Sequence, residues 1–138
     1  MNNIKIIKNW EDNGLLELKV EAISEYVSVN QLCYIQDTDL EENAIRIKAF
    51  SYNFTSPCYV EFGKKVGNYT PAFSLEFLPS DKRGKIKIEI DMEIADNEER
   101  KHRCCFYIYS EIGLVEQFGV KLFQIATQNA LEESELNI

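Results

Sequence analysis

The sequence contains few of the side chains on which catalytic and metal sites depend. Among its 138 residues there is one histidine, and no two of its four cysteines form a Cys-x-x-Cys pair. His102 and Cys104 would share one face of a strand, but two ligands do not complete a metal site. The glycine-rich patterns of P-loops and of dinucleotide-binding folds are both absent. We therefore expect a protein without catalytic activity, cofactor or bound metal.

Long apolar runs are also missing. No stretch approaches the roughly 18 apolar residues of a membrane-spanning helix, and the start of the chain lacks the apolar run of a signal peptide. These features predict a cytoplasmic protein without membrane partners, whose thiols stay reduced; the cysteines are Cys33, Cys58, Cys104 and Cys105. The length and the 45% share of hydrophobic residues predict a single domain over residues 1–138.

Positive charge is scarce relative to negative charge. The 15 Lys and Arg residues against 23 Asp and Glu residues leave a net charge of -8, which argues against binding to a nucleic-acid backbone. The acids gather in two predicted loop regions and in the C-terminal tail. The first loop does not meet the EF-hand pattern, because the sixth and twelfth positions, which need Gly and Glu, are Glu42 and Lys48.

The clearest structural pattern lies between residues 84 and 128. Apolar and charged residues alternate strictly from Gly84 to Ile94, which predicts an antiparallel strand with one buried and one solvated face. A second, aromatic-rich strand is predicted over 103–109. From Ser110 to Gln128 the apolar residues recur at helical spacing. This segment predicts a hairpin with a helix laid across its apolar face.

The rest of the chain predicts further strands and one short helix. We expect strands over 4–7, 16–22, 28–36, 44–52 and 72–78, with a turn at Asn13-Gly14. Ser56 as N-cap, Pro57 after it and Gly67 at the end predict a helix over 56–66, and the acidic segment 129–138 is predicted to be frayed. The expected fold is α+β: a mainly antiparallel sheet of six to seven strands, a short inner helix and a C-terminal helix.

The alternating and helical positions together define the expected core. It consists of Leu16, Leu18, Val20, Ile45, Ile47, Phe73, Leu75, Phe77, Ile86, Ile88, Ile90, Phe106, Ile108, Leu114, Phe118 and Leu122.

Three segments resemble the WapI-type immunity proteins. They are Ala49-Phe50, Ser56 to Val66 and, most of all, Phe106 to Leu122, where Tyr-Ile-Tyr-Ser-Glu is followed by Phe-Gly and Lys-Leu. In that family a small cytosolic protein binds and blocks the toxin domain of a contact-dependent toxin. The resemblance implies a cognate toxin as the partner, and many such toxins are nucleases with basic clefts.

Acidic loops suit such a partner, because they steer association with a basic surface. We predict that the acids of the two loop regions lie near the contact surface: Asp37, Asp39, Glu41, Glu42, Asp96, Glu98 and Glu99.

Two other classes of protein fit the same sequence. A small-molecule or glycan-binding β module would use Trp10, Tyr107 or Tyr109 in a concave face. A structural subunit would use none of them. An aromatic-lined pocket would favour the binding module, and a flat acidic patch would favour the inhibitor.

Overall fold

The structure is a computed structural model that describes residues 2–63, 72–79, 83–94, 99, 101–128 and 133–137. Its elements in chain order are β1 (Asn3–Asp12), β2 (Leu15–Ile23), β3 (Ser28–Gln36), α1 (Asp37–Tyr52), β4 (Cys58–Phe62), β5 (Ala72–Pro79), β6 (Lys85–Ile94), β7 (His102–Glu111), α2 (Ile112–Thr127) and β8 (Glu133–Asn137). The fold is α+β with antiparallel strand pairing, as expected. Within the described residues, neither helix is long and apolar enough to cross a membrane.

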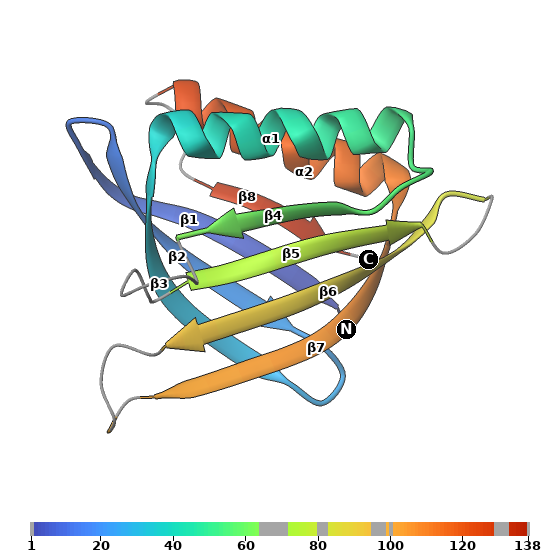
Figure 1. Cartoon of the computed structure of the whole chain (residues 1–138), viewed down its shortest axis with the longest axis horizontal. Helices are drawn as coiled ribbons and strands as arrows, with labels where there is room; N and C mark the ends of the chain where they lie inside the picture. The colour runs from blue at the N-terminus through green and yellow to red at the C-terminus, as the bar shows by residue number, and fades with distance from the viewer. Residues whose placement is uncertain are drawn as a thin grey trace.

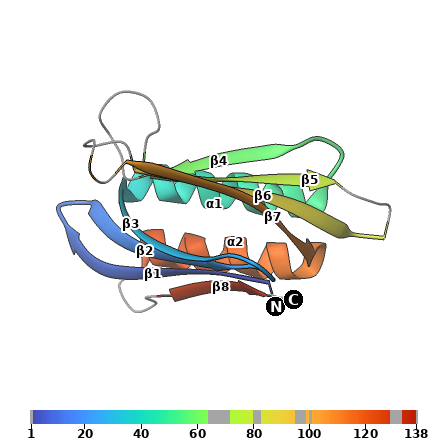
Figure 2. The same cartoon turned by 90° about the horizontal axis from the view of Figure 1, so that it is seen from below.

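The strands form two sheets of four, in the orders β3-β2-β1-β8 and β4-β5-β6-β7. The sheets form two layers (Figure 2), and α1 and α2 pack against each other along one side of them (Figure 1). Helix α1 lies next to β4, and α2 lies next to β8. The apolar faces of all these elements meet in one continuous core.

The chain is built from two structural repeats of the same order, three strands, a helix and a strand. The first repeat runs from β1 to β4 and the second from β5 to β8. The repeats exchange their last strands, because β4 pairs with β5 and β8 pairs with β1. Buried residues of α1 have buried counterparts 75 positions later in α2: Leu40 and Val115, Asn43 and Phe118, Ala44 and Gly119, Ile47 and Leu122, Phe50 and Ile125.

In both repeats the first residue of the helix donates a backbone hydrogen bond to a glycine between the first two strands. The amide of Asp37 donates to the carbonyl of Gly14 at 2.7 Å, and the amide of Ile112 donates to the carbonyl of Gly84 at 2.8 Å. Both glycines have φ near +90°, at +86° and +87°, a region that side chains disfavour. This hydrogen bond connects the start of α1 to the β1–β2 hairpin and the start of α2 to the β5–β6 hairpin.

Three predictions from sequence are wrong. Residues 37–43 and 44–52 form the single helix α1, not a loop and a strand, because Leu40, Ala44 and Ile47 share a buried helical face. Residues 58–62 of the predicted helix 56–66 form strand β4, and its end at 64–67 lies outside the described residues. Residues 133–137 of the predicted frayed tail form β8.

Other predictions are confirmed. Strand β3 has the predicted bounds, the turn at Asn13-Gly14 joins β1 to β2, and α2 falls within the predicted 110–128. Of the predicted core, Ile45 is half-exposed and Leu114 partly buried, whereas the remaining members are buried. Ile45 was misplaced because it was assigned to a strand.

Candidate functional site

An open hollow of about 700 Å³ lies between the end of β3, the first half of α1 and β4; we name it the α1 groove. Its lining residues are Leu15, Tyr34, Ile35, Gln36, Asp39, Glu42, Asn43, Arg46, Tyr59, Glu61 and Gly63. A hollow of this size lies within the range of small-ligand pockets and can also accept side chains of another protein.

A buried polar contact holds the two walls of the groove together. The side-chain amide of Asn43, on α1, donates a 2.7 Å hydrogen bond to the backbone carbonyl of Glu61, on β4. Asn43 is almost fully buried, so losing this bond would leave a buried polar group unsatisfied. The distance between α1 and β4, and hence the width of the groove, is fixed at this point.

Among the described lining residues, the groove carries more negative than positive charge. Asp39 and Glu42 are exposed on α1 and make no hydrogen bond or ion pair within the part of the chain that the structure describes. Glu61 accepts a 2.8 Å hydrogen bond from the hydroxyl of Tyr59, and both residues line the groove. Arg46 is the one basic side chain among the described lining residues. The three carboxylates favour a cationic ligand.

Tyr34 is the aromatic residue that β3 contributes to the groove. The hydroxyl of Tyr34 donates a 2.7 Å hydrogen bond to Glu17, and Asn9 donates to the same carboxylate at 3.2 Å. Both hydrogen bonds lower the pKa of Glu17, and the bond from Tyr34 has the larger effect. The same hydrogen bond raises the pKa of Tyr34. Trp10, one of the predicted ligand aromatics, lies with its ring centroid 6.2 Å from that of Tyr34 and is 42% exposed.

Helix α2 has one acid at the positions that correspond to the four acids of α1. The counterparts of Asp37, Asp39 and Glu42 in α2 are Ile112, Leu114 and Gln117, and only Glu41 has an acidic counterpart, Glu116. An acid in the first turn stabilises a helix by ~0.3–1 kcal/mol, but Glu42 lies beyond that turn. Asp37, Asp39 and Glu42 thus have no acidic counterparts in the second repeat, which singles them out as candidates for function.

The structure brings four of the predicted site residues together and separates a fifth from them. Asp37 and Glu41 are half-buried on the same two turns of α1 as Asp39 and Glu42. Glu99 is exposed in the connection between β6 and β7, whereas β4, at the other edge of that sheet, is the strand next to α1. Asp96 and Glu98 lie outside the described residues.

Of the described lining residues, the sequence predicted only Asp39 and Glu42; the polar and aromatic residues that it did not predict include Tyr34, Asn43, Arg46, Tyr59 and Glu61. Asn43 was assigned to a loop, Arg46 to a strand, and Tyr59 and Glu61 to a helix, so their side chains could not be placed on a common surface. The correspondence with α2 gives only a weak signal in the sequence, because Glu41 and Glu116 are the one identical pair when the two helices are aligned at an offset of 75 residues.

The predicted aromatics of β7 lie on the outer face of the second sheet. Tyr107 donates a 2.7 Å hydrogen bond to Glu89, and the ammonium group of Lys87 lies 4.3 Å from its ring centroid. The ammonium group of Lys85 lies 5.7 Å from the ring centroid of Tyr109. Through these contacts both tyrosines interact with side chains of the neighbouring strand β6.

One group of possible metal ligands lies on the same face. The ligand atoms of Glu89, Asp91 and Cys105 lie within 4.8 Å of one another. However, Arg103 donates to both carboxylate oxygens of Asp91, at 3.0 and 2.6 Å. The guanidinium charge opposes a second cation at this place, and the group is better explained as a partly buried ion pair.

Two of the four cysteines, Cys33 and Cys58, are buried. All four are free thiols, and Cys104 and Cys105 point to opposite faces of β7, as their neighbouring positions in a strand require. Burial raises the pKa of Cys33 to about 12 and also raises that of Cys58. Both buried thiols are therefore poor nucleophiles near neutral pH.

Comparisons of the chain with protein-family profiles, with curated proteins and with solved structures found no match.

Proposed function

We propose that this protein is a non-enzymatic inhibitor that binds a basic surface of a partner protein through the α1 groove. In the form that the resemblance to WapI-type immunity proteins suggests, the partner is a cognate toxin domain with a basic, nuclease-type cleft. The complex would then form in the cytoplasm of a bacterial cell and involve neither nucleic acid nor membrane.

The observation that carries the proposal is the pair of exposed carboxylates Asp39 and Glu42. They lie in a groove, they make no ion pair among the described residues, and the second repeat has Leu114 and Gln117 in their places. An uncompensated negative patch attracts a basic surface over several ångströms and accelerates association, and salt weakens the effect.

Asp37 and Glu41 extend this acidic patch along α1, and they are part of the proposed contact surface. Glu99, with Asp96 and Glu98 near it in sequence, would belong to a second contact region on a partner large enough to reach the β6–β7 connection. A partner of toxin-domain size meets that requirement, since typical interfaces bury ~800 Å² on each protein.

The experiment begins with capture of the partner by the tagged protein from its own cells, with washes at low and high salt. The captured protein is then expressed alone and together with this protein, so that neutralisation of its toxicity is measured directly. Recovery of a basic, toxic protein whose binding weakens with salt would support the proposal.

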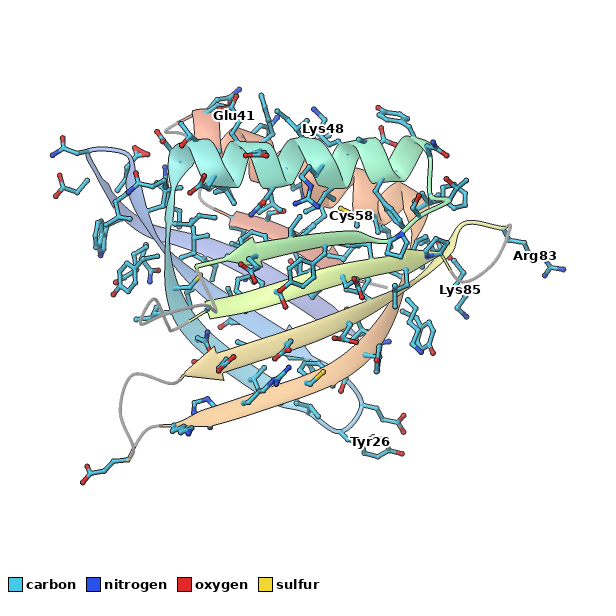
Figure 3. The ribbon with its side chains drawn as sticks, in the orientation of Figure 1. Tyr26, Glu41, Lys48, Cys58, Arg83 and Lys85 are labelled. Atoms are coloured by element: carbon cyan, nitrogen blue, oxygen red, sulfur yellow. The ribbon has the colours of Figure 1, made fainter. Side chains whose placement is uncertain are left out.

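A pair of variants tests the groove itself. Glu42→Lys and Glu25→Lys change the net charge equally, but Glu25 lies in the β2–β3 turn beside Tyr26, far from the start of α1 (Figure 3). We expect Glu42→Lys to slow association about tenfold or more at low salt, and Glu25→Lys to change it little. Equal binding and neutralisation by both variants would contradict the assignment of the groove.

The tyrosines of the groove support a second candidate, a β module that binds a small molecule or a glycan. Tyr34 and Tyr59 stand on opposite walls, on β3 and β4, and could face a ligand between them. Absence of a captured protein at either salt, together with a hit in a small-molecule screen that Tyr59→Ala abolishes, would favour this function.

A further inference from the structure

Strand β7 forms one edge of the second sheet, and among the described residues it pairs with β6 alone (Figure 1). This pairing runs without interruption over the 10 residues from His102 to Glu111. The corresponding strand of the first repeat, β3, is also an edge strand, but it packs against β4 and β5 as well. There the side-chain amide of Gln31 donates a 2.8 Å hydrogen bond to the carbonyl of Ala72. The outer side of β7 therefore presents backbone groups that no described strand occupies.

The sequence of β7 lacks the features that commonly keep an edge strand from pairing. The segment His-Arg-Cys-Cys-Phe-Tyr-Ile-Tyr-Ser-Glu contains neither proline nor lysine, and its register with β6 contains no bulge. Long, regular edges recruit a further strand, whereas short edges do so less readily. The opposite edge of the same sheet, β4, has only 5 residues. β7 is thus the edge of the second sheet that is better suited to an added strand.

The outward-facing side chains of β7 are complementary to those of a second copy of the chain. In order along the strand they are Arg103, Cys105, Tyr107, Tyr109 and Glu111. When two copies run antiparallel with their Tyr107 residues opposite each other, each Arg103 faces the Glu111 of the other copy. Each Cys105 then faces a Tyr109. Pairs of opposite charge and pairs of aromatic residues stabilise antiparallel strands when they lie directly across from each other.

Both charged residues are able to make this contact. Arg103 donates to Asp91 through Nε and Nη2, at 3.0 and 2.6 Å, and 65% of its side chain is exposed. A guanidinium group has five N–H donors, so Nη1 can donate to a second carboxylate. Glu111 is exposed and makes no hydrogen bond or ion pair within the part of the chain that the structure describes. A second copy would supply its carboxylate with a basic partner.

The corresponding strand of the first repeat lacks this complementarity. Two copies of β3 aligned about Leu32 would place Ser28 opposite Gln36 and Asn30 opposite Tyr34. None of these pairs is charged. The arrangement of opposite charges at the two ends of the strand therefore belongs to β7 and not to β3.

We propose that two copies of this chain associate through β7, antiparallel, with a two-fold axis at Tyr107. The two second sheets would then continue into one sheet across the dimer. Another register, centred on Phe106, overlaps the strands equally and keeps the same faces together, but it leaves Arg103 opposite Tyr109. The register at Tyr107 is favoured because it places a charged pair of Arg103 and Glu111 at each end of the interface.

The proposed dimer is reversible and independent of the α1 groove. A single strand pair buries less than the ~800 Å² per protein of a standard interface, so the copies should exchange. β4, which lines the α1 groove, is at the opposite edge of the second sheet, and no residue of β7 is among the described lining residues of the groove. This inference therefore goes beyond the proposed function and does not rest on it.

Sedimentation velocity of the full chain, under reducing conditions and from micromolar to millimolar concentration, tests for the dimer. We expect the average mass to rise with concentration from that of one chain towards that of two. Glu111→Lys places like charges opposite each other at both ends and should weaken dimerisation roughly fivefold or more. Glu42→Lys changes the net charge equally but alters the α1 groove, and it should leave dimerisation unchanged.

Disulfide trapping tests the register. In a Cys105→Ser background, Tyr107→Cys should form a disulfide-linked dimer under mild oxidation. Residues directly opposite each other in antiparallel strands have Cα atoms ~4.5–5.5 Å apart, which suits a disulfide. Leu32→Cys in the same background is the matched control, because Leu32 holds the corresponding position of β3 and is 41% exposed, against 46% for Tyr107. We expect the control to cross-link roughly tenfold more slowly or less.

Three results would overturn the proposal. A monomer at every concentration would leave the edge to a strand of another protein. Equal cross-linking of Tyr107→Cys and Leu32→Cys would mean that random collisions form the disulfides. Efficient cross-linking of the wild type through Cys105 would place the axis at that residue and separate Arg103 from Glu111. Capture and neutralisation of a toxin test the α1 groove separately, so failure of the dimer and failure of the proposed function are distinguishable.

Discussion

The contact between Tyr34 and Glu17 gives the rim of the α1 groove a measurable pH dependence. The hydrogen bond from Tyr34 is the main cause of the lowered pKa of Glu17. In Tyr34→Phe we expect this pKa to rise towards its ordinary value of 4.5, as measured by NMR titration of the side-chain carboxyl.

The sign of the stability effect follows from the direction of this shift. A carboxyl whose pKa is lowered by folding stabilises the native state above its ordinary pKa and loses that effect as the pH falls through the folded value. The stability difference between the wild type and Tyr34→Phe should therefore shrink as the pH falls below the ordinary value of 4.5 and through the lowered pKa of Glu17. Tyr107→Phe, which loses a similar bond to Glu89, serves as the control and should leave Glu17 unchanged. A wild-type Glu17 that titrates at 4.5 would contradict the geometry.

Two isoleucines of α1 distinguish the helix from the strand that its alternating pattern suggests. Ile45 is 50% exposed, whereas Ile47 is fully buried between the helices and the sheets. In a strand the two would share a face. We expect Ile47→Ala to lower the free energy of unfolding by about 2–5 kcal/mol and Ile45→Ala by less than ~1 kcal/mol, measured by denaturant titration. Equal losses would favour the strand.

At the scale of elements, the crossing of α1 and α2 depends on a small residue. A Cβ added at Gly119 would lie 2.9 Å from Cγ and 3.3 Å from the backbone nitrogen of Lys48, so alanine cannot enter without moving α1. Helix propensity favours alanine over glycine by ~1 kcal/mol, but overpacking costs ~1–3 kcal/mol. Gly119→Ala should therefore destabilise the protein.

Gly113 is the matched control for this prediction. It lies in the same helix, but nothing surrounds its Cβ position, so Gly113→Ala should stabilise the protein by about 0.5–1 kcal/mol. Thermal unfolding of both variants measures the two effects. If both stabilise the protein, the helices can separate enough to admit a methyl group, and the close crossing would be disproved.

At the scale of the whole molecule, the two repeats exchange their last strands. The last strand of the second repeat, β8, therefore pairs with β1 and belongs to the first sheet. Leu136 is buried opposite Ile4, and the hydroxyl of Ser134 donates to the carbonyl of Phe118 at 3.0 Å. We expect Leu136→Ala to cost about 2–4 kcal/mol, because it empties a buried site beneath α2.

The neighbouring surface pair provides the contrast. Glu133 forms an exposed ion pair with Lys5 at 3.4 Å, so Glu133→Ala should cost less than ~1 kcal/mol. Chemical denaturation measures the free energy of unfolding of both variants and so tests whether burial of Leu136 stabilises the protein more than the ion pair of Glu133. A Leu136→Ala protein as stable as the wild type would mean that β8 contributes nothing and that the tail is frayed, as its composition suggests.

The α1 segment illustrates where sequence patterns stop being decisive. Residues 44–52 alternate as a strand does, yet Leu40, Ala44 and Ile47 also recur at helical spacing, so local pattern supports both structures. Packing against α2 selects the helix, because it buries the helical face and leaves Ile45 exposed. Residues 58–62 show the reverse case: their cap-like Ser56-Pro57 favours a helix, but pairing with β5 makes them a strand.

The sequence by itself determined the α+β class, the β6–β7 hairpin, β3 and α2, because each of these has one dominant period over many residues. It also determined the charge of α1. Only the tertiary structure decided that the acids of α1 face a groove beside Tyr34 and Tyr59, since β3, α1 and β4 meet there only after folding. The pairing of β8 with β1 was likewise decided by tertiary structure, because a short polar strand has too little apolar surface to specify its own partner.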